Sequence, residues 1–241
     1  MMNRSSNLQP AYLLHRRPYA NSSLLIEYFS AVHGRFPAIA KGITGGKRRH
    51  AAAGVLQPFV PMLIHCAGRG EVKHLTQYEA LSPAVALHGR ALYCGFYLNE
   101  LLMRLLQRND PHETLFALYG DTLRQLSDES VVQQALRNFE VSLLQELGYG
   151  LILDHDVRSG EPLRPEQRYH YLFEQGPVAA TADGQSIVHG STLLALYHRE
   201  QLGPQAMREA RRMIRRVLSG YLGEKPLKSR ELFHSWDGST R

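Results

Sequence analysis

The chain changes character once, at Ser82 and Pro83, and this change constrains its fold more than any other feature. Before it, short β-rich segments alternate with turns that contain glycine and proline; after it, leucines recur at helical spacing. A chain of 241 residues is long enough for one or two domains with real hydrophobic cores. We therefore predict an α+β protein, with one domain at 1–82 and a second at 83–241.

Five short strands are predicted in the first domain. β-forming residues and turn signals place them at about 11–17, 23–29, 36–41, 55–66 and 71–81. Pro58 and Pro61 indicate that the fourth strand is irregular or bent. A glycine-rich loop at 42–54 separates the third strand from the fourth. This arrangement is typical of a small barrel such as an OB-fold, although five strands alone also fit an SH3-like barrel.

The second domain is predicted to be mainly helical. Apolar spacing, proline and glycine place helices at about 92–106, 112–126, 129–147, 191–201, 204–222 and 228–234. Aromatic and polar residues alternate at 169–173, and a Gln-Gly pair then turns the chain. This pattern predicts a small β-hairpin inside an insertion at about 151–186.

Positive charge is concentrated in the N-terminal third of the sequence. Residues 1–80 hold 10 Lys and Arg against 3 Asp and Glu, whereas residues 81–160 hold 6 against 10. A basic segment followed by an acidic one favours a polyanionic partner, most simply nucleic acid. The alternative, a solubilising surface without a partner, is left open by charge alone.

Sequence motifs for enzymatic chemistry are not found. The segment GITGGK at 42–47 is one residue short of a phosphate-binding loop, and Arg48 stands where Ser or Thr would hold magnesium. The run Asp-His-Asp at 154–156 consists of adjacent residues, which rarely point at one metal ion. We therefore expect no catalytic residues, no metal and no cofactor.

The expected location is the cytoplasm. The two cysteines, Cys66 and Cys94, suit a reducing compartment and are expected to act as small buried hydrophobes. No apolar run approaches the ~18 residues of a membrane span, and no apolar signal-peptide core follows the N-terminus. We expect no contact with a membrane.

Three groups of residues are candidates for binding. Cations lie in and after the long loop, where glycines let a phosphate chain approach: Lys41, Lys47, Arg48, Arg49, Arg69 and Lys73. Aromatic residues of the same domain are either stacking surfaces for bases or barrel core: Tyr12, Tyr19, Tyr28, Phe36 and Phe59. The second group is an arginine face on one helix, which binds anions or is simply solvated: Arg208, Arg211, Arg212, Arg215 and Arg216.

The third group is an apolar surplus on two predicted helices. Leu101 and Leu105, together with Phe139 and Leu143, would form an apolar groove with Arg137 at its rim. Such a groove suits the end of an acidic, hydrophobic peptide. Ordinary core between helices is the alternative.

Several segments, in the same order along nearly the whole chain, resemble the RecO family of bacterial DNA-repair proteins. They are VLQPFVP at 55–61, GRGEVK at 68–73, LYCGFYLNELL at 92–102, FEVSLL at 139–144 with LGYG at 147–150, and PLKSREL at 226–232. The resemblance implies an N-terminal OB-fold and a helical domain with a small zinc-ribbon-like insertion. It implies a recombination mediator and not an enzyme.

Proteins of this family bind single- and double-stranded DNA and anneal complementary strands. They engage the acidic tail of single-stranded DNA-binding protein and act with RecR to load RecA. Carried over by position, the resemblance assigns DNA binding to Lys41, Lys47, Arg48, Arg49, Arg69 and Lys73. It assigns tail binding to Leu101, Leu105, Arg137, Phe139 and Arg212.

Two features depart from the family pattern. Some members hold zinc with four cysteines after the Gly-Tyr-Gly segment, whereas residues 150–186 contain no cysteine, so a metal-free insertion is expected. Asn138 stands where members often have a second basic residue beside the arginine, so the rim of the predicted tail groove has one cation fewer than in those members. The alternative function is a protein-interaction adaptor whose OB-fold does not bind DNA; salt-sensitive oligonucleotide binding separates the two.

Overall fold

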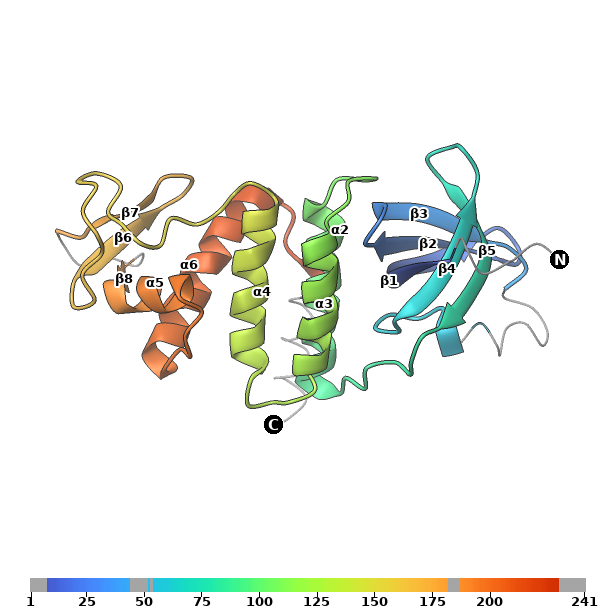
Figure 1. The fold of residues 1–241 in the computed structure, drawn as a ribbon, viewed down its shortest axis with the longest axis horizontal. Coiled ribbons are helices and arrows are strands. Elements are labelled where there is room, and N and C mark those ends of the chain that lie inside the picture. The colour runs from blue at the N-terminus through green and yellow to red at the C-terminus, as the bar shows by residue number, and fades with distance from the viewer. Residues whose placement is uncertain (1–7, 44–51, 53, 182–186, 230–241) are drawn as a thin grey trace. The chain divides into compact units, whose positions relative to one another are not determined.

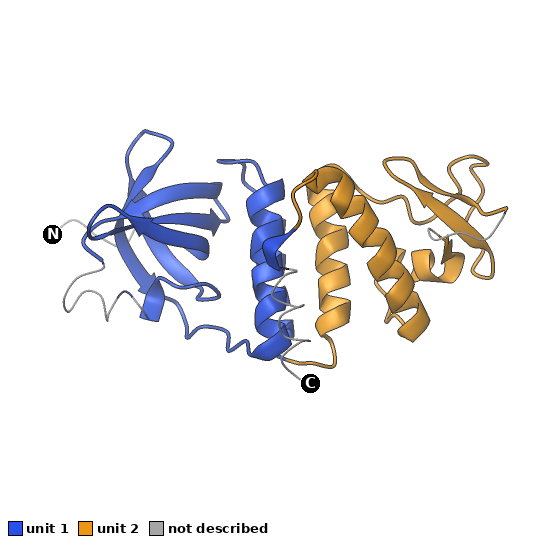
Figure 2. Ribbon diagram, turned by 180° about the vertical axis from the view of Figure 1, so that it is seen from behind, with its two compact units in different colours: residues 1–127, 227–241 blue, residues 128–226 orange. Residues whose placement is uncertain are grey.

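The computed structural model describes residues 8–43, 52, 54–181 and 187–229 (Figure 1). The chain divides into two compact units, coloured separately in Figure 2: residues 1–127 with 227–241, and residues 128–226. In the described residues, the first unit has five strands and two long helices, and the second has three helices and a small sheet. The change of pattern at Ser82 and Pro83 falls between the last barrel strand and the first long helix.

The first unit is built on a closed barrel. Its strands pair in the order β1-β2-β3-β5-β4, and only the β3–β5 pair is parallel among the pairings described. The strands are β1 (Gln9–Tyr19), β2 (Ser23–Ser30), β3 (Gly34–Ala40), β4 (Met62–Ala67) and β5 (Lys73–Ala80). The prediction of a five-stranded OB-like barrel is confirmed.

One predicted strand is too long. β4 begins at Met62, whereas the sequence pattern placed its start at Val55. The prolines explain the difference, because Pro58 and Pro61 have no N–H to donate to a strand ladder. Phe59, between them, takes a positive φ of 67°, which no extended strand accommodates.

Helices cover one wall of this barrel. The interior is filled by alternate strand residues such as Ile26, Tyr28 and Phe36, while the next residues on β1 and β2 face outward. The outward rings of Tyr12 and Phe29 pack against Phe116 and Tyr119 of a helix, with ring centroids 5.0–6.2 Å apart. That helix is α3 (Glu113–Gln125), and it follows α2 (Gly89–Leu105). Most of β2 and the first part of β1, up to Leu14, are therefore buried on both sides, whereas the end of β1 and most of β5 are exposed.

The second unit combines α4 (Val132–Glu146), α5 (Gly190–Tyr197) and α6 (Pro204–Leu222) with a small sheet. The sheet order is β7-β6-β8, formed by β6 (Arg168–Leu172), β7 (Gly176–Ala179) and β8 (Ile187–His189). The predicted hairpin is confirmed as β6 and β7, and β8 is a third strand that was not predicted. Figure 1 shows α6 between α4 and the sheet; its apolar face is buried and its arginines lie outside.

Within the part of the chain that the structure describes, no helix combines the length and apolar character needed to cross a membrane.

Candidate nucleic-acid interface

The β3–β5 side of the barrel, where most of β5 is exposed, is its open wall. Three of the predicted DNA-binding cations lie on or beside this wall. Lys41 follows β3 and is exposed, Arg69 is exposed in the turn between β4 and β5, and Lys73 begins β5. The Lys73 Nζ donates to the carbonyl oxygen of Gly68 at 3.2 Å, which holds the start of β5 against that turn. Lys73 of β5 lies opposite Ala38 of β3, and Lys41 follows Ala38 by three residues. Lys41 and Lys73 are therefore about 10 Å apart along the strand direction.

The other three predicted cations, Lys47, Arg48 and Arg49, lie outside the described residues. The chain enters their segment from Ile43, whose N–H donates to the carbonyl oxygen of Ser22 at 2.8 Å. This bond ties the end of the described stretch 8–43 to the turn between β1 and β2.

Strand register adds two residues to this end of the barrel. Pro18 of β1 lies opposite Leu24 of β2, which in turn lies opposite Ala40 of β3. Arg17 and Tyr19, the neighbours of Pro18, therefore share one barrel end with Lys41. Arg17 was not a candidate from sequence, and the signal that could have found it is its place at the end of a strand beside the basic loop.

Most of the aromatic stacking candidates are core residues. Tyr12, Tyr28, Phe36 and Phe59 are buried, and Tyr19 is the member of this group that is exposed, at 47%. The open wall thus offers cations and few aromatic faces, which favours contact with the sugar-phosphate backbone over base stacking.

Cys66 of β4 lies near this wall. Burial raises the pKa of its thiol to about 12, and the nearby Lys73 ammonium offsets only part of that rise. The thiol is therefore neutral at ordinary pH, which agrees with a packing role and not a nucleophilic one.

The residues assigned to tail binding lie on helices of both units. Leu101 and Phe139 are fully buried, and Leu105 is half-buried. Arg137 is 5% exposed, and its guanidinium forms an ion pair with Glu140 at 2.7 Å. Arg212 on α6 is exposed. Leu101 and Phe139 thus have the core role that the sequence left open as the alternative.

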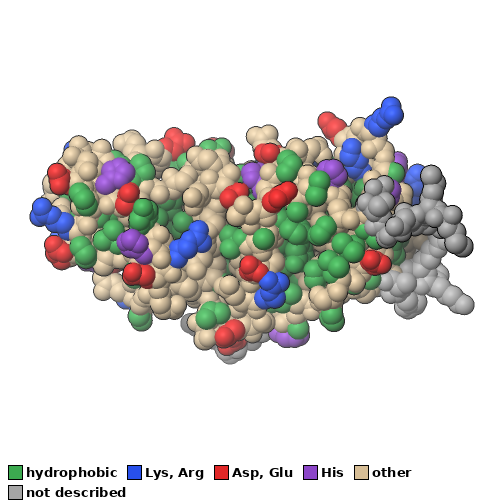
Figure 3. Space-filling model, viewed as in Figure 1, with side chains coloured by type: hydrophobic (Ala, Val, Ile, Leu, Met, Phe, Trp, Pro, Cys, Tyr) green, Lys and Arg blue, Asp and Glu red, His purple; other side chains and the backbone are tan. Residues whose placement is uncertain are grey.

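Charge on the described surface is mixed. Figure 3 shows Lys and Arg side chains scattered among Asp and Glu on the face in view, with apolar side chains between them. On that face the described Lys and Arg side chains do not form one continuous basic patch.

Both halves of the chain match models of one protein family. The model described as Recombination protein O N terminal matches residues 2–84, and that described as Recombination protein O C terminal matches residues 87–231. The chain belongs to the RecO family. Relatives with the same family name align with this chain over nearly their whole length. A DNA repair protein RecO of Methylococcus capsulatus is 50% identical over 228 residues, covering 95% of this chain and 93% of the relative.

Two further relatives have similar coverage at lower sequence identity. A DNA repair protein RecO of Alkalilimnicola ehrlichii is 48% identical, covering 94% of this chain and 90% of its own. One of Photobacterium profundum is 40% identical, covering 94% and 95%. The resemblance inferred from sequence segments is confirmed, and so is the prediction that the chain is not an enzyme, because the RecO family comprises non-enzymatic recombination mediators.

The small-sheet region of this RecO-family chain has carboxylates that are already engaged. Among the described residues, no three His, Cys, Asp or Glu side chains come together to hold a metal ion. His155 Nδ1 lies 2.7 Å from Asp154 Oδ1, and the buried Asp156 carboxylate accepts backbone N–H groups from Arg158, Ser159 and Ala179. Hydrogen bonds within the chain thus engage the carboxylates of Asp154 and Asp156.

Proposed function

We propose that this chain is a DNA-repair protein of the recombination-mediator type that binds single- and double-stranded DNA and anneals complementary strands. The observation that carries the proposal is the open barrel wall of a RecO-family chain, with Lys41, Arg69 and Lys73 on it. The opposite wall is covered by α3, so an OB-like barrel of this kind has its β3–β5 side available to a strand.

Charge neutralisation accounts for annealing. Two single strands repel each other, and a surface that holds both lowers this repulsion. Each phosphate neutralised on a single strand steepens the log–log dependence of affinity on salt by about 0.7. Lys47, Arg48 and Arg49 belong to the same proposed surface by their place in the sequence.

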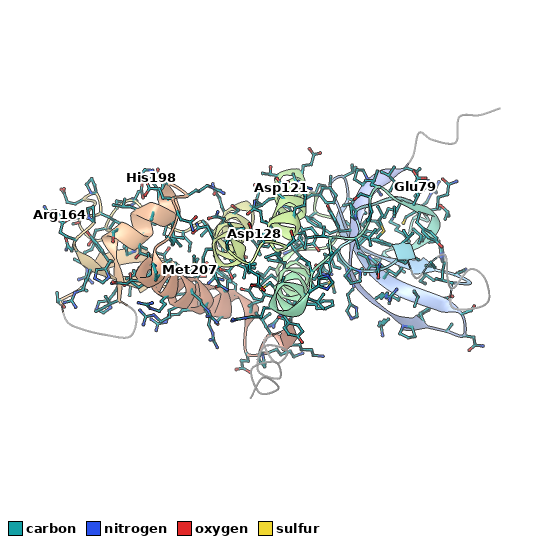
Figure 4. All side chains as sticks on the ribbon, turned by 90° about the horizontal axis from the view of Figure 1, so that it is seen from below. Glu79, Asp121, Asp128, Arg164, His198 and Met207 are labelled. Atoms are coloured by element: carbon teal, nitrogen blue, oxygen red, sulfur yellow. The ribbon has the colours of Figure 1, made fainter. Side chains whose placement is uncertain are left out.

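The test measures binding of a labelled single-stranded oligonucleotide across a salt series. Combined replacement of Lys41, Arg69 and Lys73 by Ala should reduce the salt slope by about 2, because three phosphate contacts are lost. The triple variant Lys47→Ala, Arg48→Ala, Arg49→Ala should have the same effect and slow annealing. The matched control is Arg164→Ala, an exposed arginine of the second unit (Figure 4). Unchanged slopes in both triple variants would refute the assignment.

Partners of the chain follow from the same family. We propose that it acts in the cytoplasm with RecR to load RecA, and that, of the residues which the resemblance assigns to tail binding, the exposed Arg212 contacts the acidic tail of single-stranded DNA-binding protein. The exposed Arg212 is the cleanest test, because Arg137 is already paired with Glu140. Arg212→Glu should abolish binding of an acidic C-terminal peptide and leave the fold intact, and retained binding would contradict the assignment.

A further inference from the structure

An exposed aromatic cluster on the second unit has no role in the proposed function. The rings of Tyr149 and Tyr221 are stacked, with centroids 4.1 Å apart and planes 18° from parallel. The ring of Phe173 lies 4.9 Å from that of Tyr221. Tyr149 is 45% exposed and Phe173 38% exposed. Single exposed aromatics are common on proteins, but three in contact form one apolar surface, which makes this cluster a candidate binding site.

Three separate elements position these rings. Tyr149 follows the end of α4, Phe173 follows β6, and Tyr221 lies in the last turn of α6. A Cβ atom at Gly220 would lie 2.3 Å from the Phe173 ring, so the ring rests directly on the helix backbone. Glycine weakens a helix, and here it is the residue that lets this ring lie against α6.

Arginines adjoin the cluster. Phe173 also lines a hollow between the sheet and α6, whose apolar lining includes Tyr171, Met213 and Val217. Arg212 and Arg216 line the same hollow and are exposed. Figure 4, which labels Met207 near the start of α6, shows side chains that end in nitrogen along this helix. Arg212 and Tyr221 lie about 13 Å apart along α6 and about half a turn apart around it. Phe173 joins the arginines and the tyrosines into one strip around the helix, because it lines the hollow and its ring also lies beside Tyr221.

Two carboxylates lie near the strip. Glu209 lines the hollow, where burial tends to raise the pKa of its carboxyl, but hydrogen bonds from His189, Thr192 and Gln205 outweigh burial, lower that pKa and keep the carboxyl charged. The two arginines of the hollow therefore exceed its carboxylate by one positive charge. Partial burial and the nearby Glu174 carboxylate raise the pKa of the Tyr221 hydroxyl, so that ring stays neutral.

We propose that this strip is a second contact for single-stranded DNA, separate from the barrel wall. Bases stack on the Tyr149–Tyr221 pair, and an adjoining phosphate contacts Arg216. Every base has a flat face that can stack on an aromatic ring, whereas the bases of a duplex are hidden. An acidic peptide end would use the arginines but leave the exposed face of Tyr149 without a role. The inference rests on the proposed DNA-binding function and assigns it a further site.

The experiment compares two probes of equal length and charge: a labelled thymidine oligonucleotide and its abasic counterpart. The wild-type chain should bind the thymidine probe more tightly. The double variant Tyr149→Leu, Tyr221→Leu should lose about five- to tenfold affinity for that probe and none for the abasic one. Tyr149→Phe should behave as the wild type, which shows that the ring and not the hydroxyl matters. Arg216→Gln should weaken both probes and lower the salt slope by about 0.7.

Tyr197→Leu is the matched control, because Tyr197 is 52% exposed on α5 of the same unit and lies outside the cluster. If the double variant binds the thymidine probe as this control does, the second site is refuted while DNA binding by the barrel stands. If the wild-type chain binds neither probe, both proposals fall. If the double variant loses only an acidic peptide, the strip is a peptide surface and the inference is overturned.

A measurement on the unaltered chain removes any dependence on variant folding. Irradiation of the wild-type complex with an oligonucleotide that carries 5-bromodeoxyuridine should attach the probe to peptides that contain Tyr149 or Tyr221. Attachment confined to peptides of the barrel would overturn the inference.

Discussion

Asn99 of α2 donates a hydrogen bond from its Nδ2 to the carbonyl oxygen of Leu14, at 2.9 Å. Leu14 is the residue at which β1 shifts its register against β2, between the pairs of Leu13 and His15. The extra residue of such a bulge has no partner in the strand ladder. The buried Asn99 side chain thus supplies the donor that the Leu14 carbonyl lacks in the strand ladder. The Tyr119 hydroxyl donates in turn to Asn99 Oδ1.

We expect Asn99→Ala to destabilise the first unit by about 2–3 kcal/mol, because the buried Leu14 carbonyl loses its donor. Tyr119→Phe should cost only about 1 kcal/mol, since it removes one hydroxyl and keeps the ring packing. Urea denaturation of the full chain measures both, with Gln125→Ala, an exposed residue of α3, as the control. Equal losses for Asn99→Ala and Gln125→Ala would show that the bond is not structural.

A charged cluster makes a second connection between the barrel and the helical part of the same unit. Glu27 of β2 is buried and pairs with Arg35 at 3.1 Å and with Arg108 at 2.6 Å. Glu27→Ala should cost about 3 kcal/mol, because it leaves the largely buried Arg35 without its counter-charge. Arg108 is half exposed, so Arg108→Ala should cost at most about 1 kcal/mol. Chemical denaturation of the two single variants measures both losses of stability. A larger loss for Arg108→Ala than for Glu27→Ala would contradict this prediction.

Gly190 at the start of α5 lies against the backbone of the loop before β6. A Cβ atom there would come within 2.0 Å of the Arg164 carbonyl oxygen. Gly190→Ala should therefore destabilise the second unit by about 2–3 kcal/mol through overpacking. Gly203, before α6, has open space around it, so Gly203→Ala should cost less than about 1 kcal/mol. Thermal unfolding of both variants tests this, and similar melting temperatures would contradict it.

Sequence patterns predicted the regular elements well where the local signal was strong. The range of α6, Pro204–Leu222, matches the prediction because a proline and a glycine mark its ends. β8 was missed since three residues are too few to show a period. Its identity as a strand comes from pairing with β6, which is a tertiary contact.

The candidate site was harder to predict, since one residue type serves two roles. Tyr28 and Tyr19 are both aromatic residues of the barrel strands or their ends, yet one is fully buried and the other is 47% exposed. Period-two alternation places Tyr28 on the inner face only once the barrel closes. The stacked Tyr149–Tyr221 pair could not be found from sequence, because 72 positions separate residues that only the fold brings together.

Asp156 gives the second unit a dependence on acid. Burial tends to raise the pKa of its carboxyl, but hydrogen bonds from the N–H groups of Ser159, Arg158 and Ala179, with the charge of Arg158, outweigh burial and lower it below the ordinary 3.8. A lowered pKa in the folded state stabilises that state above the ordinary value, and the contribution is lost as the pH falls through the folded-state pKa.

Asp156→Asn should therefore destabilise the small-sheet region by roughly 2 kcal/mol at pH 7, because an amide replaces a carboxylate that accepts three backbone N–H groups. The difference in stability between Asp156→Asn and the wild type should shrink below about pH 4, where the wild-type carboxyl begins to take up a proton and lose its charge. Hydrogen exchange of the Ser159 and Ala179 amides, followed from pH 7 downward, reports on this region directly. Asp154→Asn is the control, because the side chain of Asp154 is 46% exposed and its carboxylate pairs only with His155 among its described contacts. A constant difference between Asp156→Asn and the wild type at every pH would show that the charge of this carboxylate does not stabilise the loop.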